Sequence, residues 1–247
     1  MQITVVKVGG NELDDPVFLD GLSAAVTTFN GPMVLVHGGG KEISAALSHY
    51  GVHSEFIGGL RVTSPEAMAI MQMVVCGTIN TRVVSRLVAD GVRALGLSGV
   101  DLALLGCVPQ RPGGVDLGRV GLITRVDVAA IQAVVGLGWL PVFAPVARGD
   151  DDGLSYNVNA DQVAQAIAGA FVGAELLFVS NVPGVILGGQ VAAQLGRADV
   201  AAAIASGEIS GGMIPKVQAA LDALDAGAVS ARITNLAGFS GGGTRIL

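Results

Sequence analysis

The chain has 247 residues, of which 51% are hydrophobic and 4% aromatic, and a formal net charge of −6 at pH 7. This length suffices for one large α/β domain or two small lobes. An acidic chain without a basic stretch lacks the positive surface that phosphate neutralisation requires, which excludes nucleic acid as a partner.

Apolar content raises the question of a membrane segment. The longest candidate span, residues 133–147, is short and interrupted by Pro141 and Pro145, whereas a spanning helix needs about 20 apolar residues. No signal peptide is recognised before the first strand. We therefore expect a cytoplasmic protein with no membrane contact. The two cysteines, Cys76 and Cys107, have no metal-binding spacing and are predicted to be reduced core thiols.

Short β-rich runs alternate with helical patterns along the chain. The predicted buried strands are residues 3–8, 33–37, 93–97, 140–144 and 175–179, and the predicted helices are residues 41–50, 65–90, 127–137, 160–172, 200–206 and 213–226. A hairpin is expected over residues 185–191. This alternation predicts an α/β fold with an open, largely parallel central sheet and helices on both faces.

Lys7 lies near the end of the first predicted strand, two residues before Gly9 and Gly10. An unpaired charge in an apolar strand is costly, so Lys7 needs an anionic partner. A carboxylate in a buried salt bridge is one possibility. A phosphate is favoured, because Lys7 is one of only three lysines, with Lys41 and Lys216, and an ammonium fits a phosphate oxygen more compactly than an arginine fork.

Glycines then cluster where other predicted strands end, at residues 38–40, 58–59, 211–212 and 241–243. In open α/β sheets, ligands bind at the carboxyl ends of strands, where glycine allows a close approach of the backbone. The run of His37 and residues 38–40 precedes a helix, whose free N–H groups and positive end form an anion site. His37 itself is predicted to be a structural residue rather than a base. The clusters together predict one shared cleft.

Polar residues follow at the later strand ends. Arg61 is a planar fork suited to a substrate carboxylate, and it is equally well a surface arginine. Asn157, Asn159 and Asp161 lie at the start of a predicted helix, where Asp161 either caps the helix or holds lysines and substrate in register. Lys216 lies one turn into the helix that residues 211–212 open. The residues alone therefore predict polyanion binding in a glycine-lined cleft.

Seven short runs resemble, in the same order, those of the amino acid kinase family. They are KVGG (7–10), HGGG (37–40), GLRVT (59–63), NVNAD (157–161), SNVPGV (180–185), GGMIPK (211–216) and GTRIL (243–247). The resemblance covers essentially the whole chain and, within the family, favours members that phosphorylate N-acetyl-L-glutamate. It implies a single domain over residues 1–247, with an acidic-substrate lobe in 1–174 and a nucleotide-binding lobe in 175–247.

The resemblance also implies roles for the residues at matching positions. Lys7 and Lys216 would stabilise the transferred phosphoryl group, and Asp161 would orient both lysines. The substrate-binding residues would be Gly39, Gly40, Arg61, Asn157 and Asn159. The nucleotide, with Mg²⁺ bridging its phosphates and no metal site built from protein ligands, would contact Gly9, Gly10, Asn181, Val182, Pro183, Gly184, Val185, Ile186, Glu208, Ile209, Ser210 and Gly212.

The reaction that the resemblance implies is in-line attack of the γ-carboxylate of N-acetyl-L-glutamate on ATP, which yields an acyl phosphate and ADP in arginine biosynthesis. A carboxylate with a pKa of about 4 is already ionised at neutral pH, so no general base is needed. Alignment and charge stabilisation then carry the catalysis.

Two alternatives stay open. The run SNVPG also resembles a kinase for aminoadipate or glutamate attached to a small acidic carrier protein, and a non-catalytic nucleotide-binding protein could use the same scaffold. Asn181 stands where kinases of acetylglutamate commonly carry Asp, which leaves its nucleotide contact open. In the family that the chain resembles, arginine-inhibited members carry an extra N-terminal helix before the first strand. Here the first predicted strand starts near residue 3, so the resemblance implies a homodimer rather than a hexamer, without arginine feedback.

Overall fold

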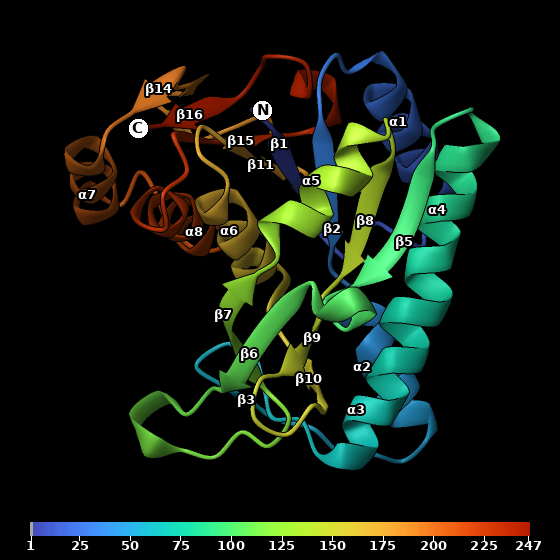
Figure 1. Cartoon of the computed structure of the whole chain (residues 1–247). Helices are drawn as coiled ribbons and strands as arrows, with labels where there is room; N and C mark the ends of the chain where they lie inside the picture. Colours follow the sequence, from blue (N-terminus) through green and yellow to red (C-terminus); the bar gives the residue numbers. More distant parts are fainter. Residues whose placement is uncertain (1) are drawn as a thin grey trace.

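A central eight-stranded sheet spans the protein in the computed structural model, which describes residues 2–247 (Figure 1). Its strands, in spatial order, are β14 (Gln194–Leu195), β16 (Thr244–Ile246), β15 (Ser230–Thr234), β11 (Glu175–Val179), β1 (Thr4–Val8), β2 (Met33–His37), β8 (Leu140–Ala144) and β5 (Ala94–Ser98). All neighbouring strands pair in parallel except β15 and β16. The predicted open, largely parallel sheet is confirmed.

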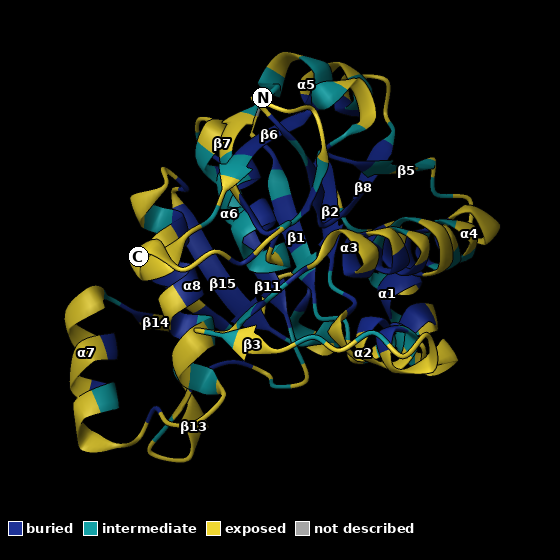
Figure 2. Ribbon diagram, turned by 90° about the horizontal axis from the view of Figure 1, so that it is seen from below, coloured by how far each residue is buried: buried dark blue, intermediate teal, exposed yellow. Residues whose placement is uncertain are grey.

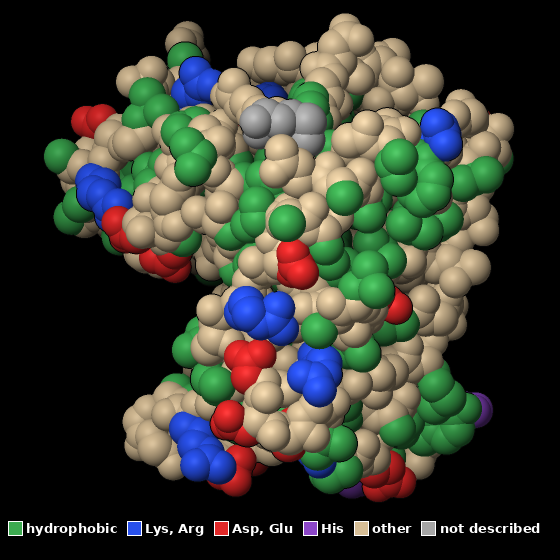
Figure 3. Space-filling view, viewed as in Figure 1, with side chains coloured by type: hydrophobic (Ala, Val, Ile, Leu, Met, Phe, Trp, Pro, Cys, Tyr) green, Lys and Arg blue, Asp and Glu red, His purple; other side chains and the backbone are tan. Residues whose placement is uncertain are grey.

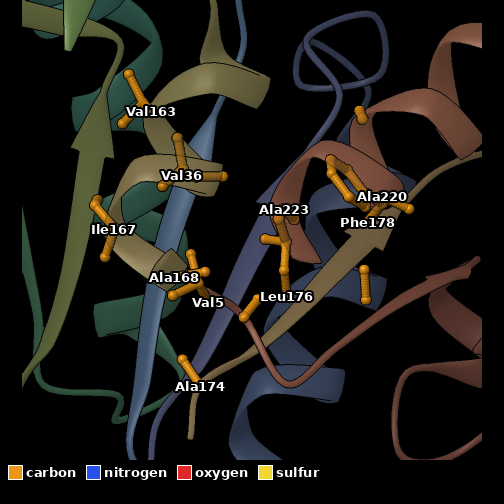
Figure 4. Close-up of a cluster of buried hydrophobic side chains, with 14 of the residues drawn as sticks. Val5, Val36, Val163, Ile167, Ala168, Ala174, Leu176, Phe178, Ala220 and Ala223 are labelled. Carbon is orange, nitrogen blue, oxygen red and sulfur yellow. The ribbon is translucent and has the colours of Figure 1, made fainter. Parts of the chain in front are cut away.

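Helices cover both faces of this sheet, because successive residues of a strand point to opposite faces. On β1, Val5 packs into one hydrophobic layer, and Val6 and Val8 pack into the other. The first layer includes α5 (Val128–Gly136), α6 (Ala160–Ala170), α7 (Arg197–Ser206) and α8 (Met213–Asp225); the second includes α1 (Pro16–Thr28), α2 (Gly40–His49), α3 (Pro65–Gln72) and α4 (Asn80–Ala89). Figure 4 shows part of the first layer, in which Val5 and Leu176 of the sheet lie between residues of α6 and α8. Strands β1, β2, β8, β11 and β15 are largely buried, whereas α7 and α4 expose their outer faces (Figure 2).

A second sheet lies below the first in Figure 1 and was not predicted. Its order is β10 (Ser155–Asn157), β9 (Val146–Gly149), β6 (Leu105–Pro109) and β7 (Gly121–Val126). Two ribbons complete the strands: β3 (Phe56–Ile57) with β4 (Leu60–Arg61), and β12 (Ile186–Leu187) with β13 (Gln190–Val191). The second ribbon confirms the predicted hairpin, whose turn residues Gly188 and Gly189 have φ of 55° and 78°. Short 3₁₀ turns occur at Asp101–Ala103, Pro112–Gly114 and Leu236–Gly238.

The predicted helix over residues 65–90 is one continuous helix, Pro65–Ala89, with a π-helical segment at Met73–Ile79 between α3 and α4. Among the helices within residues 2–247, this one is long and apolar enough, by length and composition, to cross a membrane. Of its most apolar stretch of 18 residues, 44% is buried inside the protein. The expectation that residues 133–147 form the longest candidate was therefore wrong. The apolar stripe of the long helix packs on the second layer of the core, which accounts for its hydropathy.

Candidate active site

The surface is deeply notched between the part that carries α7 and α8 and the part that carries β6 and β7 (Figure 3). Lys7 follows the alternation of β1 and therefore shares a face with Val5, the face that α6 and α8 cover. Lys7, Lys216 and Asp161 line one cavity of about 370 Å³. The structure thus brings the two predicted lysines to one space, from β1 and from α8.

Asp161 lies in the first turn of α6 because Asn159 caps that helix. The Asn159 side chain accepts a hydrogen bond from the Asp161 backbone N–H at 2.7 Å. The cap therefore falls on Asn159, and the Asp161 carboxylate is free to pair with Lys7, with 2.8 Å between Lys7 Nζ and Asp161 Oδ1. The two charges are in contact, but the angles at the two atoms are not those of a hydrogen bond. Within residues 2–247, no other group donates a hydrogen bond to Asp161 Oδ1. The ion pairs of the described chain join Asp161 to Lys7 and not to Lys216, so its role toward both lysines stays a prediction.

Two glycine loops meet beside this ion pair. A Cβ at Gly10 would lie 2.2 Å from Gly39 N and 2.7 Å from the carbonyl carbon of Gly38, so no side chain fits at that position. The Gly38 N–H donates to Val8 O at 3.1 Å, which ties the second loop to the end of β1. Helix α2 then begins at Gly40 without a side-chain cap. The first N–H groups of α2 are therefore available to an anion.

A second cavity of about 240 Å³ contains all five predicted substrate-binding residues, Gly39, Gly40, Arg61, Asn157 and Asn159. Lys7 and Asp161 line this cavity as well as the first, so the two cavities meet at the ion pair.

Arg61 is held in the second cavity with 8% of its surface exposed. Its Nη2 donates to Ser44 Oγ at 2.7 Å and to Gly40 O at 3.3 Å, and its guanidinium lies 4.5 Å from the centroid of the Phe56 ring. Burial lowers the pKa of Arg61 from its ordinary value. No carboxylate pairs with it among residues 2–247. A nearly buried cation without a carboxylate is suited to an anionic ligand.

The predicted nucleotide-binding residues divide into two groups. Gly9, Gly10, Asn181 and Gly212 line the first cavity. The structure does not bring the others to its wall; they are Val182, Pro183, Gly184, Val185, Ile186, Glu208, Ile209 and Ser210. The side chains of Val185 and Ile209 belong to the hydrophobic core, so only their backbone groups could contact a ligand. Glu208 accepts a hydrogen bond from Gly188 N–H at 3.2 Å and thus supports the β12–β13 hairpin.

Sequence reasoning missed several residues that line the cavities. Asn11, Glu12, Ser180 and Pro215 line the first cavity. Ser180 and Pro215 lie within the runs that carry the resemblance and Asn11 directly follows Gly10, so a signal for these three was present, whereas Glu12 had none. The second has an apolar wall of Ile43, Phe56, Met71, Val120 and Pro145. These apolar residues carry no local signal that separates them from the core.

His37 is fully buried directly before the glycine loop of residues 38–40, as expected of a structural residue. Its Nδ1 lies 2.8 Å from Gly38 O, and its Nε2 lies 3.0 Å from Asn80 Nδ2. Burial lowers the pKa of His37 to about 4, although the hydrogen bond to Gly38 and the negative charge of Glu42 oppose the shift.

The buried histidine predicts a loss of stability in acid. Unfolded His37 takes up a proton near pH 6.5, whereas folded His37 stays neutral until about pH 4, so its contribution is intact above pH 6.5 and declines as the pH falls from 6.5 to 4. The free energy of unfolding should fall by about 3 kcal/mol over this window through His37. Urea unfolding between pH 7 and pH 4 checks this: His37→Gln should remove that part of the slope, and His49→Gln, at an exposed histidine, should retain it. Equal slopes for wild type and His37→Gln would contradict the prediction.

Comparison with known proteins adds sequence relationships to this geometry. A model of the amino acid kinase family matches residues 2–235. The acetylglutamate kinase of Chloroflexus aurantiacus is 65% identical over 243 residues, which cover 98% of this chain and 96% of the relative. The acetylglutamate kinase of Roseiflexus sp. (strain RS-1) is 49% identical over 98% of this chain and 92% of the relative.

Solved structures share the architecture. The structure of smu.665 from Streptococcus mutans UA159 is 27% identical, with a TM-score of 0.81 over 99% of this chain and 98% of that chain. The N-acetylglutamate synthase of Neisseria gonorrhoeae, complexed with coenzyme A and N-acetyl-glutamate, has a TM-score of 0.82 over 99% of this chain and 59% of that chain. Its identity of 22% establishes a common fold only.

Proposed function

The chain belongs to the amino acid kinase family, and on this premise we propose that it transfers the γ-phosphoryl group of ATP to the γ-carboxylate of N-acetyl-L-glutamate. Relatives that are 65% and 63% identical over nearly the full chain are acetylglutamate kinases. The observation that carries the proposal is the meeting of two cavities at the Lys7–Asp161 pair. One cavity supplies lysines and glycine backbone for a polyphosphate, and the other supplies Arg61 for an acidic acceptor.

The reaction needs alignment more than acid–base chemistry. The acceptor carboxylate is ionised at neutral pH because its pKa is about 4, so the neutral, buried His37 is not required as a base. Arg61 binds the α-carboxylate as a charge-assisted fork and directs the γ-carboxylate toward Lys7. Lys7 and Lys216 then stabilise the negative charge on the oxygens of the transferred phosphoryl group.

The apolar wall of the second cavity gives a reason for an acylated substrate. Phe56, Met71, Val120 and Pro145 offer no carboxylate to a free α-ammonium group. An acetyl group is neutral and presents a methyl to such a wall. The carboxylate that lines this cavity, Asp161, is already paired with Lys7, so the ammonium of free glutamate would lose water without a free ionic partner. Residues 1–174 would thus form the acidic-substrate lobe and residues 175–247 the nucleotide-binding lobe.

Mg²⁺ would enter the site with ATP. Residues 2–247 contain no cluster of three or more metal-ligating side chains, and the carboxylates that line the first cavity are those of Glu12 and Asp161. This donor set fits a cation that keeps several waters and binds mainly to the nucleotide, with one or two carboxylates from the protein. Glu12 and Asp161 would hold the ion, and the ion would supply positive charge against the nucleotide phosphates.

An ADP-release assay tests the proposed acceptor. Purified protein is given ATP and Mg²⁺ with N-acetyl-L-glutamate, L-glutamate, L-aspartate or aminoadipate on its acidic carrier protein. We expect kcat/KM for N-acetyl-L-glutamate to exceed that for L-glutamate by about 100-fold, because the free ammonium is left unpaired. Preference for the carrier-bound substrate would replace the proposed acceptor, and no ADP above background with any acceptor would indicate a nucleotide-binding protein without this activity.

We also propose a cytoplasmic homodimer. Strand β5 is one of the two edges of the eight-stranded sheet, and the long helix beside it exposes Met73 and Val88. An edge strand offers unpaired backbone groups, which a second copy of the chain pairs under two-fold symmetry. Sedimentation should give a particle of twice the 24.7 kDa chain mass; a monomer at micromolar concentration would exclude the dimer.

A further inference from the structure

The long helix adopts π-helical hydrogen bonding over Met73–Ile79, directly before Asn80. Such segments are rare and frequently lie at functional sites. Here the segment packs against the glycine loop: a Cβ at Gly39 would lie 3.1 Å from Val75 Cγ1 and 2.8 Å from Ile79 Cδ1. The helix therefore contacts the backbone from which α2 begins.

Asn80 joins three strands of the sheet to this loop. It is 5% exposed, and its Nδ2 donates to His37 Nε2 at 3.0 Å and to Val142 O at 2.9 Å. Its Oδ1 lies over Gly96 of β5, where a Cβ would come within 2.2 Å. Asn80 thus contacts β2, β8 and β5 at once.

The Asn80 contact selects one form of the imidazole. Because Asn80 donates to Nε2, that nitrogen accepts, and the proton of neutral His37 lies on Nδ1. His37 Nδ1 then donates to Gly38 O at 2.8 Å. A buried chain of hydrogen bonds consequently leads from β8 through Asn80 and His37 to the carbonyl of Gly38.

The carbonyl of Gly38 determines the direction of the next N–H group. In a planar trans peptide, the C=O of one residue and the N–H of the next point to opposite sides. With Gly38 O held by His37, the Gly39 N–H points away from the imidazole. Gly39 N lies against Gly10, and both glycines line the second cavity.

We propose that Asn80 and His37 are positioning residues for phosphoryl transfer: Asn80 fixes the imidazole, the imidazole fixes the Gly38–Gly39 peptide, and the Gly39 N–H is thereby held as a donor to the transferred phosphoryl group. Neither side chain lines the two cavities, so both act through the glycine backbone. This inference rests on the proposed kinase function.

Asn80→Ala, with Val83→Ala as its matched control, separates positioning from stability. Val83 is also buried on α4, and its apolar side chain forms no hydrogen bond to His37. Both variants lose core contacts and are assayed at a temperature at which each is folded. Asn80→Ala should lower kcat about tenfold, with KM for ATP and for N-acetyl-L-glutamate within about twofold of wild type. Val83→Ala should keep kcat within about twofold; equal kcat values for the two variants would overturn the proposal.

Gly96→Ala tests the same series of hydrogen bonds from the side of Asn80 that faces β5. The new methyl displaces the Asn80 amide without touching the glycine loop, so we expect a comparable loss in kcat. In an Asn80→Ala background the clashing oxygen is gone, and Gly96→Ala should then change kcat by less than about twofold. Additive losses in the double variant would show that Gly96 acts by another route and would overturn the proposed chain. If Asn80→Ala fails to fold, the loss in kcat of the single Gly96→Ala variant still tests the proposal.

A readout without turnover keeps this inference separate from the proposed function. The backbone amide resonance of Gly39 in the ¹H–¹⁵N spectrum should shift in Asn80→Ala and stay in place in Val83→Ala. An unmoved Gly39 amide in Asn80→Ala overturns the positioning role even if the enzyme is active. If the wild type is inactive but the Gly39 amide shifts in Asn80→Ala as expected, the proposed acceptor is wrong, whereas the hydrogen bonds from Asn80 through His37 to Gly38 still position the Gly39 N–H.

Discussion

Lys216→Ala is expected to lower kcat for the phosphorylation of N-acetyl-L-glutamate by about 10²–10³-fold, the loss typical of removing one preorganised donor to a transition state. Lys216 lines the cavity that also contains Lys7 and Asp161, and it belongs to no ion pair within residues 2–247. Its removal therefore takes away a charge that faces the ligand without leaving a buried carboxylate unpaired. Lys216→Arg should restore little, because the guanidinium fork replaces a compact ammonium.

Lys41 provides the matched control for this experiment. It is the remaining lysine outside the cavity, it is 57% exposed, and it pairs with Asp14 at 2.6 Å. Lys41→Ala should leave kcat within about twofold, because a surface ion pair contributes little. Steady-state kinetics at saturating ATP and acceptor measure both variants. A loss of less than about fivefold in Lys216→Ala would remove Lys216 from the catalytic role.

Arg61→Ala is expected to raise KM for N-acetyl-L-glutamate by about 10- to 100-fold, since a hydrogen bond to a charged group contributes about 1.5–3 kcal/mol. Because Arg61 contacts the bound acceptor in the ground state as well as in the transition state, kcat should change much less than KM. Arg61→Lys should recover only part of the loss, as it retains the charge but loses the fork and the stacking on Phe56.

Arg93→Ala is the control for the substitution of Arg61. Arg93 also stacks on an aromatic ring, with its guanidinium 5.4 Å from the centroid of the Trp139 ring, but it lies outside both cavities. Its KM for N-acetyl-L-glutamate should equal that of wild type. If KM is unchanged in Arg61→Ala as well, Arg61 does not bind the acceptor carboxylate.

The large sheet was largely predictable from the sequence. Strands β2, β8 and β11 begin and end at the predicted residues, because each is a continuous apolar run between turn residues. The second sheet was missed because its strands are short and form neither a continuous apolar run nor a strict alternation, as in the GLITRV run of β7. Helix α1 was missed although Asp15 caps it and Pro16 opens it, a signal that was available.

Much of the candidate site was also predictable, but as separate pieces. The glycine runs marked the strand ends, and Lys7 was expected near the end of the first strand beside one of them. The pattern left Lys7 with either a carboxylate or a phosphate as its partner, and the structure shows a carboxylate beside an open cavity. It likewise left Asp161 as either a cap or a partner of lysine, and the cap is Asn159.

By itself, the sequence determined which continuous apolar runs form strands of the large sheet and where glycines let the backbone approach a ligand, because these properties depend on neighbours along the chain. Only the tertiary structure decided that Arg61 pairs with no carboxylate among residues 2–247 and that Asn80 contacts His37. Those contacts join segments far apart in sequence, and their geometry is set by how helices pack on the sheet. A local pattern contains no information on that packing, since it records the chemistry of a side chain but not the distance to its partner.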